Sequence, residues 1–210
     1  MYSVGFDLDL TLADTRAGIA AVYDEVARRL GVVIDSTVVI SRLGPPLEQE
    51  LTYWLPPEEI AGAAALYRSL YPGTAVPMTT LMAGALEAVA EVRRHGGRVI
   101  VVTGKHGDTA RQTVEFLGLD VDEVVGSVFG AAKGAAIANF GAAVYVGDHV
   151  GDIAAARAGR AVSVTVATGP YSEEALRDHG ADFVLPDLTG FAGWYEAWRV
   201  QEIGAVSTVM

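Results

Sequence analysis

Two aspartates separated by one residue, Asp7 and Asp9, are the first residues of this chain whose types and spacing could do chemistry. They follow the short apolar run of residues 3–6. If the extended conformation persists beyond that run, the two-residue spacing points both carboxylates in the same direction. One carboxylate can then act as a nucleophile while the other, its proton affinity raised by nearby negative charge, protonates a leaving group. The alternative is that Asp9 or Thr11 only shapes a turn.

Polar residues at three later points suggest a phosphate and a metal ion. Thr103 and Gly104 end another apolar run, and a hydroxyl and an amide can both donate to phosphate oxygens. Asp148 and Asp152 lie four residues apart just after a third run, and hard oxygen ligands of this kind suit Mg2+. Lys133 opens a helical pattern, where the helix dipole disfavours a cation unless an anion sits nearby.

Each of these residues, taken alone, also has a simpler interpretation. Thr103 is compatible with a turn, and Lys133 with a solvated surface lysine. Asp152 is compatible with a helix cap. The position of all of them relative to the strands therefore matters more than any single motif.

Short β-branched runs alternate with helical patterns along most of the chain. The predicted strands are residues 3–6, 98–102, 142–146 and 162–166. The predicted helices are residues 83–94, 108–117, 133–140, 152–158 and 172–179. This alternation predicts an α/β fold with a parallel sheet, in which ligands bind beyond the carboxyl ends of the strands. The first polar residues after the strands are Asp7, Thr103 and Asp148, so we expect them to meet at one edge of the sheet.

One region breaks the alternation. Residues 15–82 carry helical pattern and several prolines but no convincing strand run. Such a segment is long for a single crossover between strands. We therefore predict an inserted α-helical cap domain at 15–82 and a catalytic core made of 1–14 and 83–210. The alternative is that these helices simply pack on the sheet.

The composition narrows the class of protein. The chain has 210 residues, 51% apolar, which is enough for one core and a small accessory domain. Its net charge of −11 would repel nucleic acid, and every apolar stretch long enough to span a membrane is interrupted by a charge. It lacks cysteine, and its first residues do not resemble a signal peptide. These features predict a cytoplasmic protein that binds neither nucleic acid nor membrane.

Four motifs in this order resemble the haloacid dehalogenase superfamily, in its phosphatase branch with a small helical cap. They are Asp7-x-Asp9-x-Thr11, Thr103, Lys133, and Gly147-Asp148 followed by Asp152. The resemblance covers nearly the whole chain and implies a Rossmann-like parallel-sheet core. A looser likeness to phosphoglycolate phosphatase-type proteins rests on Thr103-Gly104-Lys105, Tyr67-Arg68 with Tyr71, and Met82-Ala83-Gly84.

The resemblance also implies a role for each residue. Asp7 would attack phosphorus, and Asp9 would protonate the departing oxygen and later activate water. Thr103 and Lys133 would hold the phosphoryl oxygens. Mg2+ would be bound by the Asp7 carboxylate, the Asp9 main-chain carbonyl and Asp148, with Asp152 coordinating directly or orienting a metal-bound water.

Two positions depart from the family pattern. Leu10 stands where these phosphatases usually have glycine, so the loop after Asp9 is expected to be narrower or less flexible. Gly104 replaces a common asparagine, which removes a side-chain contact but leaves the amide available.

The predicted activity is hydrolysis of small phosphomonoesters, such as phosphoglycolate or a sugar phosphate, by a monomer or homodimer. Arg42, at the edge of the predicted cap, is a candidate to pair with a carboxylate or second phosphate of the substrate. Arg68, His106 and His149 could also contact the substrate or lie in solvent. A phosphomutase or a non-catalytic phospho-acceptor domain are the alternatives.

Overall fold

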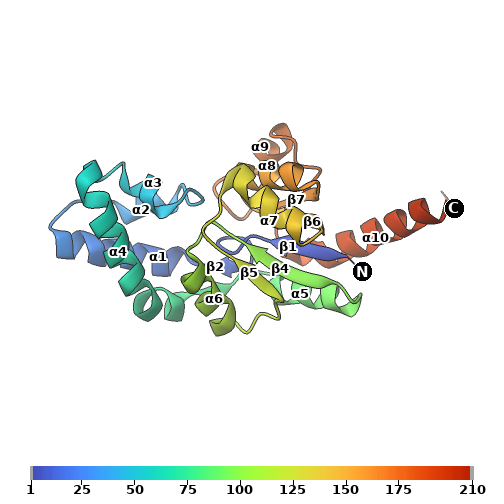
Figure 1. Cartoon of the computed structure of the whole chain (residues 1–210), viewed down its shortest axis with the longest axis horizontal. Coiled ribbons are helices and arrows are strands. Elements are labelled where there is room, and N and C mark those ends of the chain that lie inside the picture. The colour runs from blue at the N-terminus through green and yellow to red at the C-terminus, as the bar shows by residue number, and fades with distance from the viewer. Residues whose placement is uncertain (1, 209–210) are drawn as a thin grey trace.

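A six-stranded parallel sheet forms the centre of the molecule in the computed structural model, which describes residues 2–208, and side chains as far as residue 201 (Figure 1). The strand order is β5-β4-β1-β6-β7-β8. In that order the strands are Glu123–Val125, Arg98–Val102, Ser3–Phe6, Ala142–Gly147, Val162–Val166 and Phe183–Leu185. Every neighbouring pair in this sheet is parallel.

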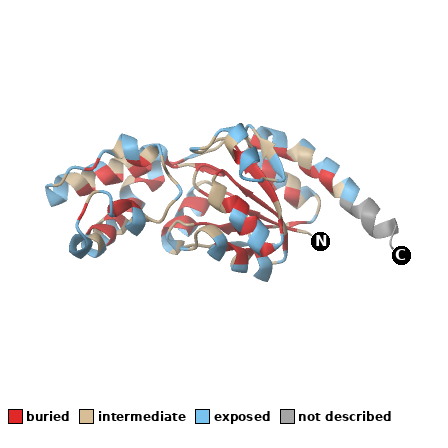
Figure 2. Ribbon diagram, turned by 90° about the horizontal axis from the view of Figure 1, so that it is seen from above, coloured by how far each residue is buried: buried red, intermediate tan, exposed pale blue. Residues whose placement is uncertain are grey.

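The central strands are apolar at nearly every position because both faces of the sheet are covered. In β4, Val99 and Val101 pack into one hydrophobic cluster, while Ile100 and Val102 pack into another on the opposite face. The period of two that separates these sets is that of a pleated strand. Figure 2 shows the strands as a buried layer between more exposed helices.

Helices cover the two faces of the sheet. Those of the core are α5 (Ala85–Arg94), α6 (Gly107–Phe116), α7 (Lys133–Asn139), α8 (Val150–Gly159), α9 (Glu173–Asp178) and α10 (Phe191–Thr208). Residues of α5, α6 and α10 belong to the first cluster, and residues of α7 and α8 belong to the second. Short 3-10 turns precede two of these helices, at Gly130–Ala132 and Leu188–Gly190.

The structure confirms the predicted α/β fold with a parallel sheet and a helical insertion. The insertion holds α1 (Arg16–Leu30), α2 (Ser36–Ile40), α3 (Leu47–Leu51), α4 (Pro57–Thr74) and a 3-10 turn at Val76–Met78. These helices have a hydrophobic cluster of their own, centred on residues such as Val22, Leu51 and Tyr71. Figure 1 shows them beyond one end of the sheet, with α10 extending from the other end.

Two short strands connect the insertion to the core. β2 (Ala13–Asp14) and β3 (Thr80–Leu81) pair in antiparallel fashion, with Ala13 opposite Leu81 and Asp14 opposite Thr80. The chain thus leaves and re-enters the core side by side. We propose that the domains divide at this pair, with residues 15–82 as the cap and residues 1–14 and 83–210 as the core.

Candidate active site

A cavity of about 310 Å³ lies between the insertion and the carboxyl ends of β1, β4 and β6. From the core it is lined by Asp7, Asp9, Leu10, Thr103, Gly104, Lys105, His106, Thr109, Ser127, Phe129 and Asp148. From the insertion it is lined by Ile19, Tyr23, Leu43, Gly44, Pro45, Pro46, Leu47, Glu48, Tyr67, Arg68 and Tyr71. The two parts touch at Gly44, where a Cβ atom would lie 2.6 Å from the ring of His149. The cavity is therefore enclosed from both sides.

Three buried carboxylates gather at the core side of this cavity. Asp7, Asp148 and Asp152 each offer an oxygen, and these oxygens all lie within 4.8 Å of one another. Asp7 comes directly after β1, and Asp148 directly after β6, the strand paired with β1. Adjacent parallel strands end at the same edge, so residues 141 positions apart in the chain meet here. Thr11 donates to Asp148 Oδ1 at 3.0 Å and helps to orient that carboxylate.

Lys133 is the cation of the cluster. Its Nζ atom lies 2.7 Å from Asp152 Oδ1 and 3.1 Å from Asp7 Oδ2, and the residue is only 1% exposed. Burial alone would lower the pKa of Lys133, but Asp152 and Asp7 outweigh it and raise the pKa well above its ordinary value. The lysine is therefore charged and is not a surface residue.

The carboxylates carry more negative charge than Lys133 can balance. Burial raises the pKa of Asp7 to about 6 against the opposing effect of Lys133, and burial also raises the pKa of Asp148. Such shifts are expected where anions are crowded together out of water. A divalent cation would relieve this crowding, and an all-oxygen donor set suits a hard ion. The residues present therefore fit a metal site.

Asp152 is set slightly apart from the other two acids. It does not line the cavity, and its second oxygen accepts a hydrogen bond from the backbone N–H of His149 at 3.1 Å. Lys133 and this amide thus occupy both of its oxygens. Direct coordination and orientation of a metal-bound water by Asp152 both remain predictions.

Asp9 lies at the cavity wall with a partner that the sequence analysis did not single out. The Nζ atom of Lys105 lies 2.8 and 3.0 Å from its two oxygens, and the hydroxyl of Thr15 donates to Oδ1 at 2.8 Å. Lys105 is nearly buried and also lies 4.4 Å from the centre of the Tyr71 ring. The sequence placed Lys105 just after a predicted strand, but its contact with Asp9 depends on the pairing of β4 with β1, which only the structure shows.

Thr103 and Gly104 form the turn after β4. The backbone of Thr103 is held by Val125 and Val128, whose bonds to it measure 2.9 and 3.1 Å. The Thr103 side chain is buried, and both residues line the cavity beside Asp7. Their role in holding a phosphoryl group remains a prediction, which this position supports.

Comparison with known proteins identifies the family. A model of the haloacid dehalogenase-like hydrolases matches residues 4–129, more than half of the chain. The chain belongs to the haloacid dehalogenase-like hydrolase family. A second model, described as HAD-hydrolase-like, matches residues 126–191. The resemblance inferred from the four motifs is confirmed.

Solved structures of other hydrolases share this fold over nearly their whole length. A haloacid dehalogenase-like family protein from Streptococcus pneumoniae has 22% identity and a TM-score of 0.81, covering 93% of this chain and 98% of that one. A predicted phosphatase from Clostridium acetobutylicum has 21% identity and the same TM-score and coverage. A predicted phosphoglycolate phosphatase from Haemophilus somnus has 17% identity and a TM-score of 0.78, with 93% and 98% coverage. At these identities the likeness establishes the fold.

One curated relative carries a different name. The tyrosine-protein kinase PtkA of Mycobacterium tuberculosis (strain ATCC 25618 / H37Rv) is 28% identical over 116 residues. The matched segment covers 55% of this chain and 40% of that relative's length.

Leu10 shows how this hydrolase accommodates its departure from the family pattern. Its φ of 59° lies in the left-handed region, which a leucine adopts only at a cost of about 1–2 kcal/mol. Its N–H donates to the carbonyl of Ala13 at 2.8 Å, and its carbonyl accepts from the Thr168 hydroxyl at 2.5 Å. The loop therefore keeps a backbone conformation typical of glycine while adding a side chain that lines the cavity.

The four candidate substrate contacts of this hydrolase divide into two groups. Arg68 and His106 line the cavity, while Arg42 and His149 do not. Both guanidinium nitrogens Nε and Nη2 of Arg42 donate to Glu50, at 2.9 and 2.7 Å, and the group lies over the Tyr53 ring. Arg42 as a substrate-binding residue thus finds no support in the geometry.

Proposed function

We propose that this hydrolase is a Mg2+-dependent phosphatase that cleaves small phosphomonoesters through an aspartyl-phosphate intermediate on Asp7. The observation that carries the proposal is the cluster of Asp7, Asp148, Asp152 and Lys133 at one end of the cavity, with Asp7, Asp9 and Asp148 at its wall. This arrangement provides a nucleophile, a charge-neutralising group and a second carboxylate for proton transfer. Phosphatase names among the structural relatives support the same reaction class.

In the proposed reaction, a carboxylate oxygen of Asp7 forms a bond to phosphorus while the bond from phosphorus to the leaving oxygen breaks. Asp9, protonated before this step, gives its proton to the leaving oxygen. It then takes a proton from the water that attacks phosphorus, while the bond between phosphorus and the Asp7 oxygen breaks. Lys133 and the hydroxyl and amide of Thr103 and Gly104 stabilise charge on the phosphoryl oxygens. Release of inorganic phosphate returns Asp7 to its starting state.

The metal would be held by the carboxylates of Asp7 and Asp148, by the Asp9 main-chain carbonyl, and directly or through water by Asp152. When bound, Mg2+ supplies positive charge that offsets the phosphoryl oxygens and the crowded carboxylates. The small substrate would lie in the cavity between cap and core. Among the described residues no helix has the length and apolar character needed to cross a membrane. A cytoplasmic location and a monomeric or homodimeric state remain predictions from the sequence.

A phosphomutase is the main alternative, since it would use the same aspartyl phosphate but return the phosphoryl group to a sugar. The likeness to a protein named as a tyrosine kinase adds a third activity to be tested. Both alternatives predict products that differ from free phosphate.

The test is release of inorganic phosphate from a panel of small phosphomonoesters, with and without Mg2+, by wild type and Asp7→Asn. We expect release that needs Mg2+ and is lost in Asp7→Asn. A parallel incubation with ATP and a tyrosine-containing peptide tests for kinase activity. Isomerised sugar phosphate without free phosphate would point to a mutase, and a phosphorylated peptide would point to a kinase.

A further inference from the structure

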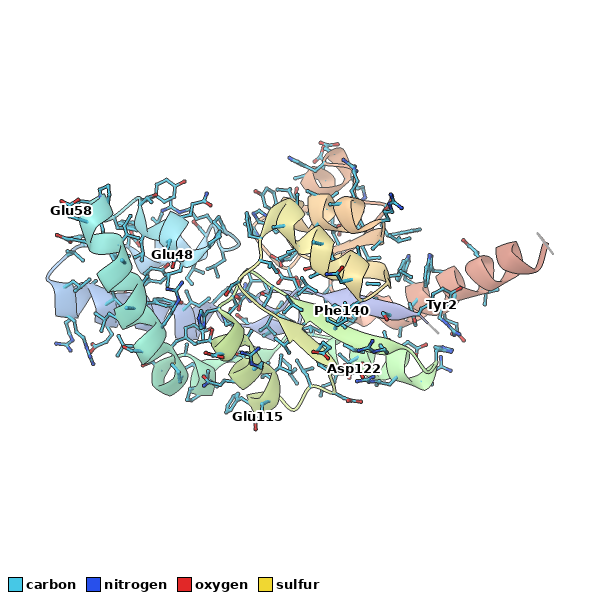
Figure 3. All side chains as sticks on the ribbon, viewed as in Figure 1. Tyr2, Glu48, Glu58, Glu115, Asp122 and Phe140 are labelled. Atoms are coloured by element: carbon cyan, nitrogen blue, oxygen red, sulfur yellow. The ribbon has the colours of Figure 1, made fainter. Side chains whose placement is uncertain are left out.

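The positive charges that line the cavity are each matched by a carboxylate. Among the described residues, Arg68 and Lys105 are the arginine and lysine side chains at its wall. Nη2 of Arg68 lies 2.5 Å from Glu48 Oε1, and Lys105 is bonded to both oxygens of Asp9. Glu48, which lies on α3 in the insertion (Figure 3), also lines the cavity.

Glu48 is placed to remain ionised. Burial tends to raise the pKa of Glu48, but the hydrogen bond from Arg68, a backbone hydrogen bond and the charge of Arg68, with a smaller contribution from His106, bring it below its ordinary value. His106 is the remaining basic side chain at the wall, and it contributes slightly to the lowered pKa of Glu48. A second anionic group on a substrate would compete with Glu48 for Arg68 and His106.

Arg42, which does not line the cavity, is also paired with a carboxylate. Arg42 is bonded through two nitrogens to Glu50, which is 7% exposed at its side chain. The phosphoryl end is different, because Lys133 and a bound divalent cation would meet the substrate's phosphate there. Beyond that end, the described arginine and lysine side chains of the wall are each paired with a carboxylate.

The rest of the wall is largely apolar. Ile19, Leu43, Pro46, Tyr67, Tyr71 and Phe129 are among the residues that form it. At about 310 Å³ the cavity falls at the lower end of the range that holds drug-sized ligands. A leaving group of two carbons would leave much of it unfilled.

We infer that the phosphatase selects phosphomonoesters whose leaving group is uncharged and has an apolar face, and that it discriminates against a carboxylate or a second phosphate there. The inference rests on the proposed function and narrows its substrate class. Of the two classes predicted from the sequence, it favours a neutral phosphorylated alcohol or sugar over phosphoglycolate.

A matched pair of substrates isolates the charge. 2-Phosphoglycolate and 2-hydroxyethyl phosphate both have two carbons and differ in whether the second carbon is a carboxylate carbon or carries a hydroxyl group. We expect kcat/KM to be higher for the hydroxyethyl ester by about tenfold or more, the size of one charge-assisted hydrogen bond. Phenyl phosphate, whose leaving group is apolar and larger, should exceed both.

A pair of variants tests the origin of the preference. Glu48→Gln removes the carboxylate that pairs with Arg68. It should reduce the kcat/KM ratio of 2-hydroxyethyl phosphate to 2-phosphoglycolate by about tenfold, through higher activity on 2-phosphoglycolate. Glu25→Gln removes one charge from the same domain, but Glu25 pairs with Arg28 and Arg29 on α1 and does not line the cavity. It should leave the preference unchanged.

Two outcomes would overturn the inference. One is a higher kcat/KM of wild type for 2-phosphoglycolate than for 2-hydroxyethyl phosphate. The other is the same ratio of these two kcat/KM values in Glu48→Gln and Glu25→Gln. If none of the three esters releases phosphate, the proposed function fails. In that case, calorimetric titration of the two matched esters into wild type with Mg2+ tests the inference. Tenfold tighter binding of the hydroxyethyl ester would support the inference, and equal binding would reject it.

Discussion

At the scale of single residues, the contact between Lys105 and Asp9 is the main addition that the structure makes to the site predicted from the sequence. Asp9 could be singled out from its spacing to Asp7, since that spacing depends only on a strand's period. Lys105 could not be distinguished in the same way from a solvated lysine, because its role depends on β4 lying next to β1. Its low exposure and two bonds to Asp9 follow from that pairing. Arg42 illustrates the converse, because Glu50 is eight residues away and no local pattern predicts their contact.

Lys105→Met tests whether the ammonium group positions Asp9. The change keeps most of the side chain's length but leaves the Asp9 carboxylate with the Thr15 hydroxyl as its side-chain partner. We expect kcat/KM for phosphate release to fall about tenfold to a hundredfold, mainly through kcat, because a poorly placed acid transfers its proton less effectively. Steady-state kinetics on phenyl phosphate measure the effect.

Lys105→Arg serves as the control for this prediction. It keeps the positive charge and can still donate to Asp9, so it should recover part of the lost kcat. Equal rates in wild type and Lys105→Met would show that Asp9 needs no help from Lys105.

Among the strands, the buried ones could be predicted and the short or partly exposed ones could not. β4 and β7 are rich in β-branched residues, and every residue of β1 is buried, because helices cover both faces of these strands; their predicted bounds agree with the structure. β5 and β8 are three-residue edge strands with partly exposed residues, so neither leaves a buried run in the sequence. β2 and β3 have two residues each, and their pairing depends on the whole cap lying between them.

The start of α8 makes a prediction about stability. Nδ1 of His149 accepts a hydrogen bond from the N–H of Gly151 at 2.9 Å, so His149 caps the helix in its neutral form. His149→Ala should lower the free energy of unfolding by about 1–2 kcal/mol, and His149→Asn should recover about 1 kcal/mol because asparagine is a good N-cap. Urea unfolding at a pH well above 7 measures both, and equal stabilities of the two variants would remove the capping role.

The same cap makes stability depend on pH. Burial lowers the pKa of His149 below its ordinary value of 6.5, so the folded state holds this proton less tightly than the unfolded chain does. The contribution is present above pH 6.5 and is lost as the pH falls from there through the lower pKa of the folded state. The stability advantage of wild type over His149→Ala should therefore shrink across that interval. A stability difference between wild type and His149→Ala that stays constant with pH would contradict this prediction.

For the whole molecule, the closed arrangement of cap and core is what completes the cavity. The sequence predicted the insertion from its length and its lack of strands, but the way the cap closes depends on contacts between distant loops. Gly44 is such a contact, with φ of 141° and no room for a Cβ atom beside the His149 ring. The charge balance of the cavity also appears only at this scale, since Glu48 and Arg68 lie twenty residues apart.

Gly44→Ala tests the closed arrangement. The added methyl group would meet the His149 ring at 2.6 Å, so either this ring or the cap loop must shift and the contact between cap and core is disturbed. We expect kcat/KM to fall about tenfold or more, because substrate positioning depends on closure. Kinetics on phenyl phosphate provide the measurement.

Gly31→Ala is the matched control in the same domain. Gly31 also has a positive φ, of 69°, but a Cβ atom there would meet nothing within 4 Å. It should reduce stability by about 1 kcal/mol and leave kcat/KM unchanged. A similar loss of kcat/KM in both variants would assign the effect to backbone strain and not to cap closure.

The central claim is that Asp7 carries the phosphoryl group during turnover. The most direct measurement is acid quenching of wild type during turnover of phenyl phosphate with Mg2+, followed by peptide mass mapping of the N-terminal segment. The account predicts a peptide heavier by one phosphoryl group, with the modification on Asp7, and no such peptide from Asp7→Asn. Steady turnover with the phosphoryl group found on another residue, or undiminished turnover by Asp7→Asn, would contradict it.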